Sequence, residues 1–298
     1  MKEPWNKRLR YCFFYPALGK FPRWLAYEIA HRVPGALGLA DRSRLSAMRQ
    51  NLVKVLGEDC NPASLIRAHY AMRSLEDLDP YFMTGIPSKY SWYDFMEFRN
   101  IEIFEQAYAR GRGVILLTGH YGRFCMAFIA LGNQGYRVGG VTVEIEDNPF
   151  WGPCEKEHFR FKTTGLEHHA GGHAAKVGNV AQLKALFSLL KGQGAAVVLV
   201  DVFDGREDNH SLSFLGGRAK FPAGILRVAH HNRSPVVGFF AHQEGKKVVI
   251  EFEQGADPES PEDYEALAQY VKILERRILA RPQEWWFWPD LQNIWSQG

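Results

Sequence analysis

From about residue 100 onward, short apolar runs alternate with segments of helical periodicity. The apolar runs predict strands at 113–118, 136–143 and 195–201, with a shorter strand at 166–169. The segments around and between them predict helices at 102–109, about 121–132, about 149–161 and about 174–191. Strands that alternate with helices predict a largely parallel sheet joined by right-handed crossovers.

Two further apolar runs, 235–241 and 247–252, are separated by the polar residues His-Gln-Glu-Gly-Lys and predict a hairpin at the edge of that sheet. A helix expected at about 261–280 and an aromatic tail at 281–289 complete the pattern. The fold class expected for residues 101–298 is therefore α/β, with a mixed, mostly parallel sheet flanked by helices.

Residues 1–100 have a helical pattern instead. Residues 42–56 and 62–75 show helical periodicity, and Asn61 before Pro62 is a suitable N-cap for the second helix. We expect this N-terminal helical region to pack on the α/β domain as part of one structural unit.

The beginning of the chain mixes aromatic and basic residues. Charges every few residues in 21–33 exclude a membrane-spanning helix, which needs about 20 apolar residues, and the segment 11–20 does not resemble a secretory signal. The mixture is typical of an amphipathic helix lying in the headgroup region of a membrane. It is equally compatible with a surface helix packed on the protein's own core. The aromatic residues that favour the membrane are Trp5, Phe13, Phe14, Phe21 and Trp24.

Composition narrows the possible functions. With 298 residues, 46% of them hydrophobic, the chain can bury a full core, and its net charge of +3 is too small to indicate nucleic-acid binding. Four widely scattered cysteines without a CxxC pair suggest neither a zinc site nor a disulfide framework. We therefore expect a reducing, cytosol-facing location.

The segment 113–125 carries the strongest sign of chemistry. Its strand ends at Thr118-Gly119, so that His120 follows at a carboxyl end of the sheet, where open α/β sheets bind their ligands. An imidazole placed there can act as a general base near neutral pH.

Other polar residues give weaker signals. The run 201–208 lacks the spacing of a calcium loop, and His168, His169 and His173 have no cysteine nearby, so we expect no metal. Without a GxGxxG or Walker pattern we expect no dinucleotide or ATP. Three loop cations could hold phosphates of a substrate, or could simply be solvated: Arg206, Arg218 and Lys220.

Four segments, in order, resemble the bacterial lipid A biosynthesis acyltransferase family, part of the lysophospholipid acyltransferase group. The first is Gly-Arg-Gly-Val-Ile-Leu-Leu-Thr-Gly-His-Tyr-Gly at 111–122, around the position of the family's catalytic histidine. The second is Asp-Asn-Pro at 147–149. The third is 214–224 with Ser-Pro-Val-Val at 234–237, and the last is Arg-Pro-Gln-Glu-Trp-Trp-Phe-Trp at 281–288.

The resemblance implies an acyltransferase. Such an enzyme moves a fatty acyl group from a thioester on acyl carrier protein or coenzyme A to a hydroxyl or amine of a lipid-like acceptor. It implies a peripheral protein at the cytoplasmic face of the bacterial inner membrane, with His120 as general base and no resident cofactor. It also implies a carboxylate five positions after the histidine, which would orient the imidazole.

This chain departs from the family at that position, where it has Cys125, and Arg123-Phe124 replace the usual Asn and Trp. A thiol is a weak hydrogen-bonding partner and is mostly neutral at its usual pKa of about 8.5. Considered alone, Cys125 is best interpreted as a small buried hydrophobe. We expect Arg123 to contact substrate.

Three hypotheses follow. In the first, His120 acts alone or another carboxylate partners it; Asp201, at the end of strand 195–201, is preferred because the ends of parallel strands converge. In the second, Cys125 accepts the acyl group, with its thiolate favoured by His120, Arg123 and a helix N-terminus. In the third, catalysis is lost and the pocket only binds lipid; a hydrolase is a more remote alternative. The carboxylates considered after Asp201 are Asp204, Glu144 and Glu146.

The aromatic tail allows two interpretations. Residues 285–288, together with Trp295, could anchor the protein at a membrane interface. They could equally form a structural clasp against the first helices.

Overall fold

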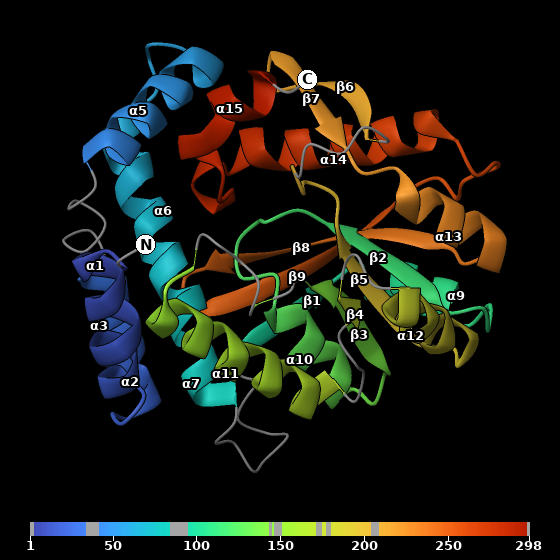
Figure 1. Ribbon diagram of the computed structural model, residues 1–298, viewed down its shortest axis with the longest axis horizontal. Helices are drawn as coiled ribbons and strands as arrows, with labels where there is room; N and C mark the ends of the chain where they lie inside the picture. Colours follow the sequence, from blue (N-terminus) through green and yellow to red (C-terminus); the bar gives the residue numbers. More distant parts are fainter. Residues whose placement is uncertain are drawn as a thin grey trace.

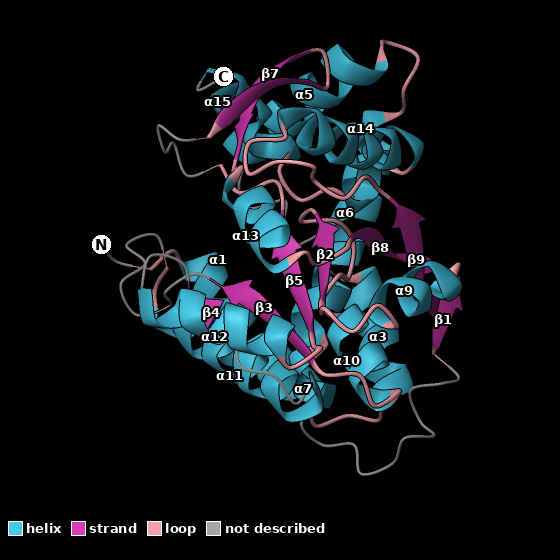
Figure 2. Cartoon of the chain, turned by 90° about the vertical axis from the view of Figure 1, so that its right-hand side faces the viewer, coloured by secondary structure: helices cyan, strands magenta, loops and turns pink. Residues whose placement is uncertain are grey.

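The computed structural model describes residues 3–33, 42–83, 95–142, 145, 151–170, 175–176, 180–203 and 209–296. Its centre is a seven-stranded sheet in the order β1-β9-β8-β2-β5-β3-β4 (Figures 1 and 2). The strands are β1 (Met96–Arg99), β2 (Val114–Thr118), β3 (Val138–Thr142), β4 (Ala175–Lys176), β5 (Ala195–Leu199), β8 (Val236–Glu244) and β9 (Lys247–Gln254).

Within this described sheet every neighbouring pair is parallel except β8 with β9. The prediction of a mostly parallel α/β sheet is therefore confirmed. The predicted hairpin exists, but its place at the edge was wrong, because β9 pairs with β1 on its other side. Strand β1 was not predicted because the charged residues Glu97 and Arg99 interrupt its apolar pattern.

Helices cover both faces of the sheet because alternate strand residues point to opposite faces. Val114 and Leu116 of β2 share a core with α9 (Ile101–Tyr108) and α10 (Met126–Asn133). Ile115 and Leu117 face the opposite layer. That layer consists of α12 (Val180–Lys191), α13 (Gly224–Asn232) and α14 (Tyr264–Ala280).

Some local predictions were wrong. The strand expected at 166–169 lies inside α11 (Pro153–Ala170), because this helix continues past its expected end at about residue 161. The helix expected from residue 121 begins at Met126, since residues 119–125 form a turn. Helix α13 and the hairpin of β6 (His210–Phe214) with β7 (Gly217–Phe221) were not predicted.

The N-terminal region is helical as expected and shares its core with the rest of the chain. The side chain of Asn61 accepts a hydrogen bond from Ser64 N, which confirms it as an N-cap. Met48 and Leu52 pack in one cluster with Trp288 and Leu291. The helices are α1 (Trp5–Arg8), η1 (Leu9–Phe14), α2 (Tyr15–Leu18), α3 (Arg23–Arg32), α5 (Arg42–Leu56), α6 (Pro62–Leu78) and α7 (Pro80–Met83).

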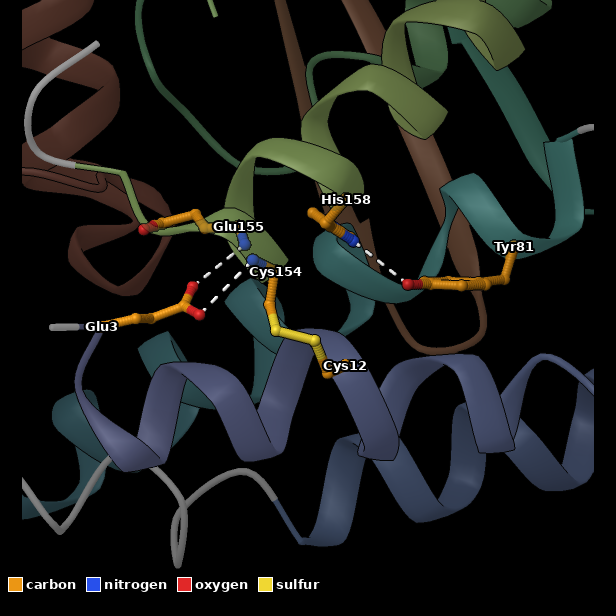
Figure 3. The surroundings of a disulfide bond; sticks show 6 residues. All are labelled: Glu3, Cys12, Tyr81, Cys154, Glu155 and His158. Carbon is orange, nitrogen blue, oxygen red and sulfur yellow. Dashed lines mark hydrogen bonds between the residues drawn. A yellow bond between two sulfur atoms is a disulfide. The ribbon is translucent and has the colours of Figure 1, made fainter. Parts of the chain in front are cut away.

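A disulfide joins Cys12 of η1 to Cys154 of α11 (Figure 3), so the expectation of no disulfide was wrong. The two cysteines are 142 residues apart in the sequence, and only the packing of η1 against α11 brings their Cα atoms to 5.3 Å. Next to the bond, the carboxylate of Glu3 accepts hydrogen bonds from the backbone N–H groups of Cys154 and Glu155. Because disulfides are typical of oxidising environments, the cysteines give no support to a reducing location.

Candidate active site

The turn that follows β2 presents His120 at the carboxyl edge of the sheet. Gly122 has a φ of +55° and lies so close to the end of β8 that a Cβ atom would collide with the carbonyl oxygen of Ala241. The same carbonyl oxygen accepts a hydrogen bond of 3.0 Å from Arg123 N. Glycine is therefore required here, and it holds the turn against the sheet.

The carboxylate of Asp201 contacts His120 directly. Its Oδ1 lies 2.8 Å from His120 Nδ1, and both carboxylate oxygens lie 2.9 Å from the backbone N of His120. The cause is the parallel register of β2 and β5, in which Thr118 is opposite Leu199. Both strands end at the same level of the sheet, so His120 and Asp201 meet although they are 81 residues apart in the sequence.

A third hydrogen-bond donor to this carboxylate comes from the C-terminal segment, where Trp285 Nε1 lies 3.0 Å from Asp201 Oδ2. Asp201 is completely buried. A carboxylate only accepts hydrogen bonds, so the proton of the neutral imidazole is on Nδ1 and the lone pair is on Nε2. No described residue hydrogen-bonds to Nε2, and the His120 side chain is 20% exposed. The arrangement therefore offers a base to an incoming ligand.

Aromatic rings surround the imidazole. The ring centroids of Phe287, Trp286 and Phe124 lie 4.7, 5.4 and 5.9 Å from that of His120. Trp286 also donates its backbone N–H to His120 O and its indole N–H to Gly122 O, each at 3.0 Å. These rings fix the orientation of the imidazole and exclude water from its sides.

The aromatic tail acts as a clasp on this turn. Tyr121 and Trp285 form an antiparallel bridge, and Gly122 N donates a hydrogen bond of 2.7 Å to the main-chain oxygen of Glu284. Trp285 and Trp288 are completely buried, and Asn51 of α5 donates to Trp288 O. The clasp thus joins the first helices, as one interpretation expected, to the His120 turn, which the sequence had not indicated.

Cys125 does not have the environment of a nucleophile, which corrects the thiol hypothesis. Its side chain is 3% exposed, in the apolar cluster beneath α10. Burial raises its pKa to about 12, although the nearby Lys162 ammonium acts in the opposite direction. The free-energy cost of removing a thiolate from water exceeds the stabilisation that this cation and the helix N-terminus would give it. Cys125 fills space in the core.

Arg123 is also not placed to contact substrate, as had been expected. It is completely buried. Its guanidinium forms an ion pair with Asp79 and donates to Gln243 Oε1 at 2.7 Å. A buried cation needs such partners, and here they come from the turn that ends α6 and from β8. Arg123 is therefore structural.

The remaining predicted residues lie elsewhere or outside the described residues. Arg218 and Lys220 lie on β7, where Arg218 donates to the hydroxyl of Ser211. Neither cation contacts His120 or Asp201 in the described structure. Asp204, Glu144, Glu146, Arg206 and His173 lie outside the described residues. In the described part, His168 lies on α11 and no group of three potential metal ligands occurs.

The chain was compared with known proteins. The family model for bacterial lipid A biosynthesis acyltransferases matches residues 8–295. A comparison with curated proteins gave no match. The matched range includes both partners of the His120–Asp201 contact and the C-terminal clasp, so the family assignment covers the whole of the site described above.

Proposed function

This chain belongs to the bacterial lipid A biosynthesis acyltransferase family, and from that premise we propose that it transfers a fatty acyl group from a thioester to a lipid-like acceptor with His120 as general base. The family implies acyltransferase activity on lipid-like acceptors. The donor is the acyl thioester of acyl carrier protein or coenzyme A, and the acceptor supplies a hydroxyl or an amine. The observation that supports the proposal is the 2.8 Å contact between His120 Nδ1 and Asp201 Oδ1.

The chemistry follows from this contact. His120 Nε2 takes the proton of the acceptor's O–H or N–H group while the acceptor oxygen or nitrogen attacks the thioester carbonyl carbon. The C–S bond then breaks, and the leaving thiolate takes that proton from the imidazolium. Asp201 holds the imidazole in the required tautomer and stabilises its positive charge during the reaction.

The resemblance to the family, and not the cysteines, supports the proposed location at the cytoplasmic face of the inner membrane, with the N-terminal helices lying in the headgroup region. Among the described residues, no helix has the length and apolarity to cross a bilayer. The N-terminal helices and the bend between α2 and α3 instead expose four aromatic side chains: Trp5 (70%), Phe13 (58%), Phe21 (46%) and Trp24 (72%). Exposed aromatic residues interspersed with basic ones are typical of helices that bind a membrane surface.

The test is an acyl-transfer assay with the purified full-length protein. It uses radiolabelled acyl-acyl carrier protein and acyl-coenzyme A as donors, and a bacterial lipid extract as acceptor. We expect labelled lipid from the wild type and a loss of about 10²-fold or more with His120→Ala. His230→Ala is the matched control, because this histidine is exposed at the end of α13.

Three outcomes would contradict the proposal. Without labelled lipid from either donor, the chain would be a catalytically silent lipid-binding member of its family. Labelled free fatty acid in place of labelled lipid would indicate a hydrolase. Transfer at the wild-type rate by His120→Ala would remove the histidine from the mechanism.

A further inference from the structure

A cluster of charged side chains lies where α6, α11 and η1 meet. It is next to Trp286, one of the aromatic rings around His120. Glu76 and Asp77 are its carboxylates, with side chains only 1% and 2% exposed. Its cations are Arg10, Arg73 and Lys162. His158 adds no charge near neutral pH, because burial lowers its pKa to about 4. In the described structure, the cluster therefore has one more positive charge than negative charges.

The excess charge belongs to Arg73. Arg10 is 2.7 Å from Asp77 Oδ2, and Lys162 forms a close ion pair with Glu76 Oε1. Arg73 is left with longer contacts, 3.6 Å to Glu76 and 4.0 Å to Asp77. These exceed hydrogen-bonding distance, and the buried Nη1 atom has no hydrogen-bond partner in the described part of the chain. A guanidinium with a missing partner in a mostly buried position favours an anion beside it.

Arg73 and the reactive imidazole both contact the ring of Trp286. The Arg73 Cζ atom is 3.4 Å from the ring centroid of Trp286, and that ring lies 5.4 Å from the His120 ring. This contact restrains the guanidinium, and because its Nη1 atom is buried, a ligand would bind through the exposed remainder of the group. The Arg73 side chain is 19% exposed and that of His120 is 20% exposed. Both side chains are therefore partly accessible to a ligand.

We infer that Arg73 binds a phosphate group of a substrate beside His120. A planar guanidinium matches the spacing of phosphate oxygens and binds them through paired hydrogen bonds. Phosphate is also the anion that both proposed substrates can supply, either from the phosphopantetheine arm of the donor or from the headgroup of a lipid acceptor. The inference rests on the proposed function and names the chemical group that this site recognises.

The experiment measures binding without turnover, by isothermal titration calorimetry on the full-length protein. The donor arm compares pantetheine 4′-phosphate with pantetheine. The acceptor arm compares dihexanoyl phosphatidic acid with dihexanoylglycerol. Each pair differs only in the phosphate. We expect the phosphate form of one pair to bind about tenfold or more tightly than its partner, since hydrogen bonds to charged groups are the strong ones.

The variants assign this preference to a residue. Arg73→Gln should abolish the preference, and Arg73→Lys, which keeps the charge without the planar fork, should reduce it. Arg67→Gln is the matched control, since Arg67 is exposed on the same helix, and it should keep the full preference. Far-UV circular dichroism and thermal midpoints establish that each variant is folded.

Each outcome decides the inference. An Arg73-dependent preference in the pantetheine pair places the donor phosphate at Arg73, and one in the lipid pair places the acceptor phosphate there. No preference in either pair, or a preference that folded Arg73→Gln and Arg73→Lys both retain, overturns the inference. Because no acyl group is transferred, failure of the proposed function in the activity assay would leave these binding results unchanged.

Discussion

His120 and Asp201 meet because two parallel strands, β2 and β5, end at the same level of the sheet. The resemblance noted in the sequence implies an acid five residues after the histidine, but that position is a buried cysteine. The carboxylate reaches the imidazole from the neighbouring strand instead. The contact is direct and fully buried on the carboxylate side, so the cysteine at 125 does not deprive His120 of an acidic partner.

Trp285 holds the carboxylate of this pair. In Trp285→Phe, Asp201 loses the 3.0 Å hydrogen bond from the indole N–H, and a hydrogen bond to a charged group contributes about 1.5–3 kcal/mol. We expect kcat/KM for acyl transfer to fall about tenfold, together with a lower thermal midpoint.

Trp288→Phe provides the comparison. Trp288 is equally buried, but its indole N–H donates to Pro282 O and not to Asp201. This variant should lose thermal stability while kcat/KM stays within a few-fold of wild type. Equal losses of activity in the two variants would contradict a specific role for Trp285.

The sequence predicts some residue contacts and not others. Asp201 was predictable because it follows a buried strand that runs parallel to the strand before His120. Neither Trp285 nor Asp79 was predictable as a partner, since their segments carry no periodicity that places them beside the turn. Arg123 looked like a substrate ligand because its ion-pair partner, 44 residues away, is visible only in the folded chain.

Among the elements, the C-terminal clasp contributes most to the site. The main-chain oxygen of Glu284 accepts a hydrogen bond from Gly122 N, and Trp286 N donates one to His120 O. Between them, the indole N–H of Trp285 donates to the carboxylate of Asp201. Glu284 is 2% exposed, and its buried Oε2 atom has no hydrogen-bond partner in the described structure. The clasp therefore contains a carboxyl group whose ionised form is poorly stabilised by its surroundings.

This carboxyl group should make stability depend on pH. Burial raises the pKa of Glu284 to about 7 from its ordinary 4.5, while the Gln243 backbone, Arg281 and Arg123 act in the opposite direction. Its stabilising contribution is complete below pH 4.5, where both folded and unfolded chains bind the proton, and it is lost as pH rises through 7. The shift corresponds to roughly 3 kcal/mol.

The measurement is urea unfolding at pH 5 and pH 8. Glu284→Gln cannot ionise, so the difference between its free energy of unfolding and that of the wild type should shift in favour of the variant's stability from pH 5 to pH 8, by up to roughly 3 kcal/mol. Glu259→Gln, which removes an exposed carboxylate, should follow the wild type at both pH values. An identical pH dependence in wild type and Glu284→Gln would show that Glu284 ionises freely.

The elements themselves were predicted unevenly, for physical reasons. Strands β2 and β5 are continuous apolar runs, and their buried positions made them evident. Strand β1 and the β6–β7 hairpin carry charged or polar residues on accessible faces, so no apolar run marks them. Residues 166–169 were mistaken for a strand because the sequence does not show that α11 packs against α10, α7 and η1.

At the scale of the whole molecule, the N-terminal helices and the His120 turn are parts of one packed structure. The disulfide joins η1 to α11, and α11 carries Lys162, which lies 5.6 Å from the ring of Trp286. A series of contacts therefore links the N-terminal helices to Trp286, which packs against His120. These helices carry the exposed aromatic residues of α1, η1 and α3.

The proposal of membrane binding predicts dependence on these aromatic side chains. The double substitution Trp5→Ala/Trp24→Ala should weaken co-sedimentation with phosphatidylglycerol–phosphatidylethanolamine vesicles about tenfold or more, since each buried aromatic side chain contributes about 1.5–3 kcal/mol. Leu279→Ala, which removes an exposed apolar side chain from α14, should bind like wild type. Equal binding by the wild type and the double variant would place the membrane contact elsewhere.

The most direct test of the central claim compares Asp201→Asn with Cys125→Ala in the acyl-transfer assay. If Asp201 is the acid that partners His120, Asp201→Asn should lower kcat by about 10²–10⁴-fold, because asparagine keeps the shape but favours the wrong tautomer of the imidazole. Cys125→Ala should stay within a few-fold of wild type. The reverse result, loss of transfer with Cys125→Ala and near-normal transfer with Asp201→Asn, would contradict the claim.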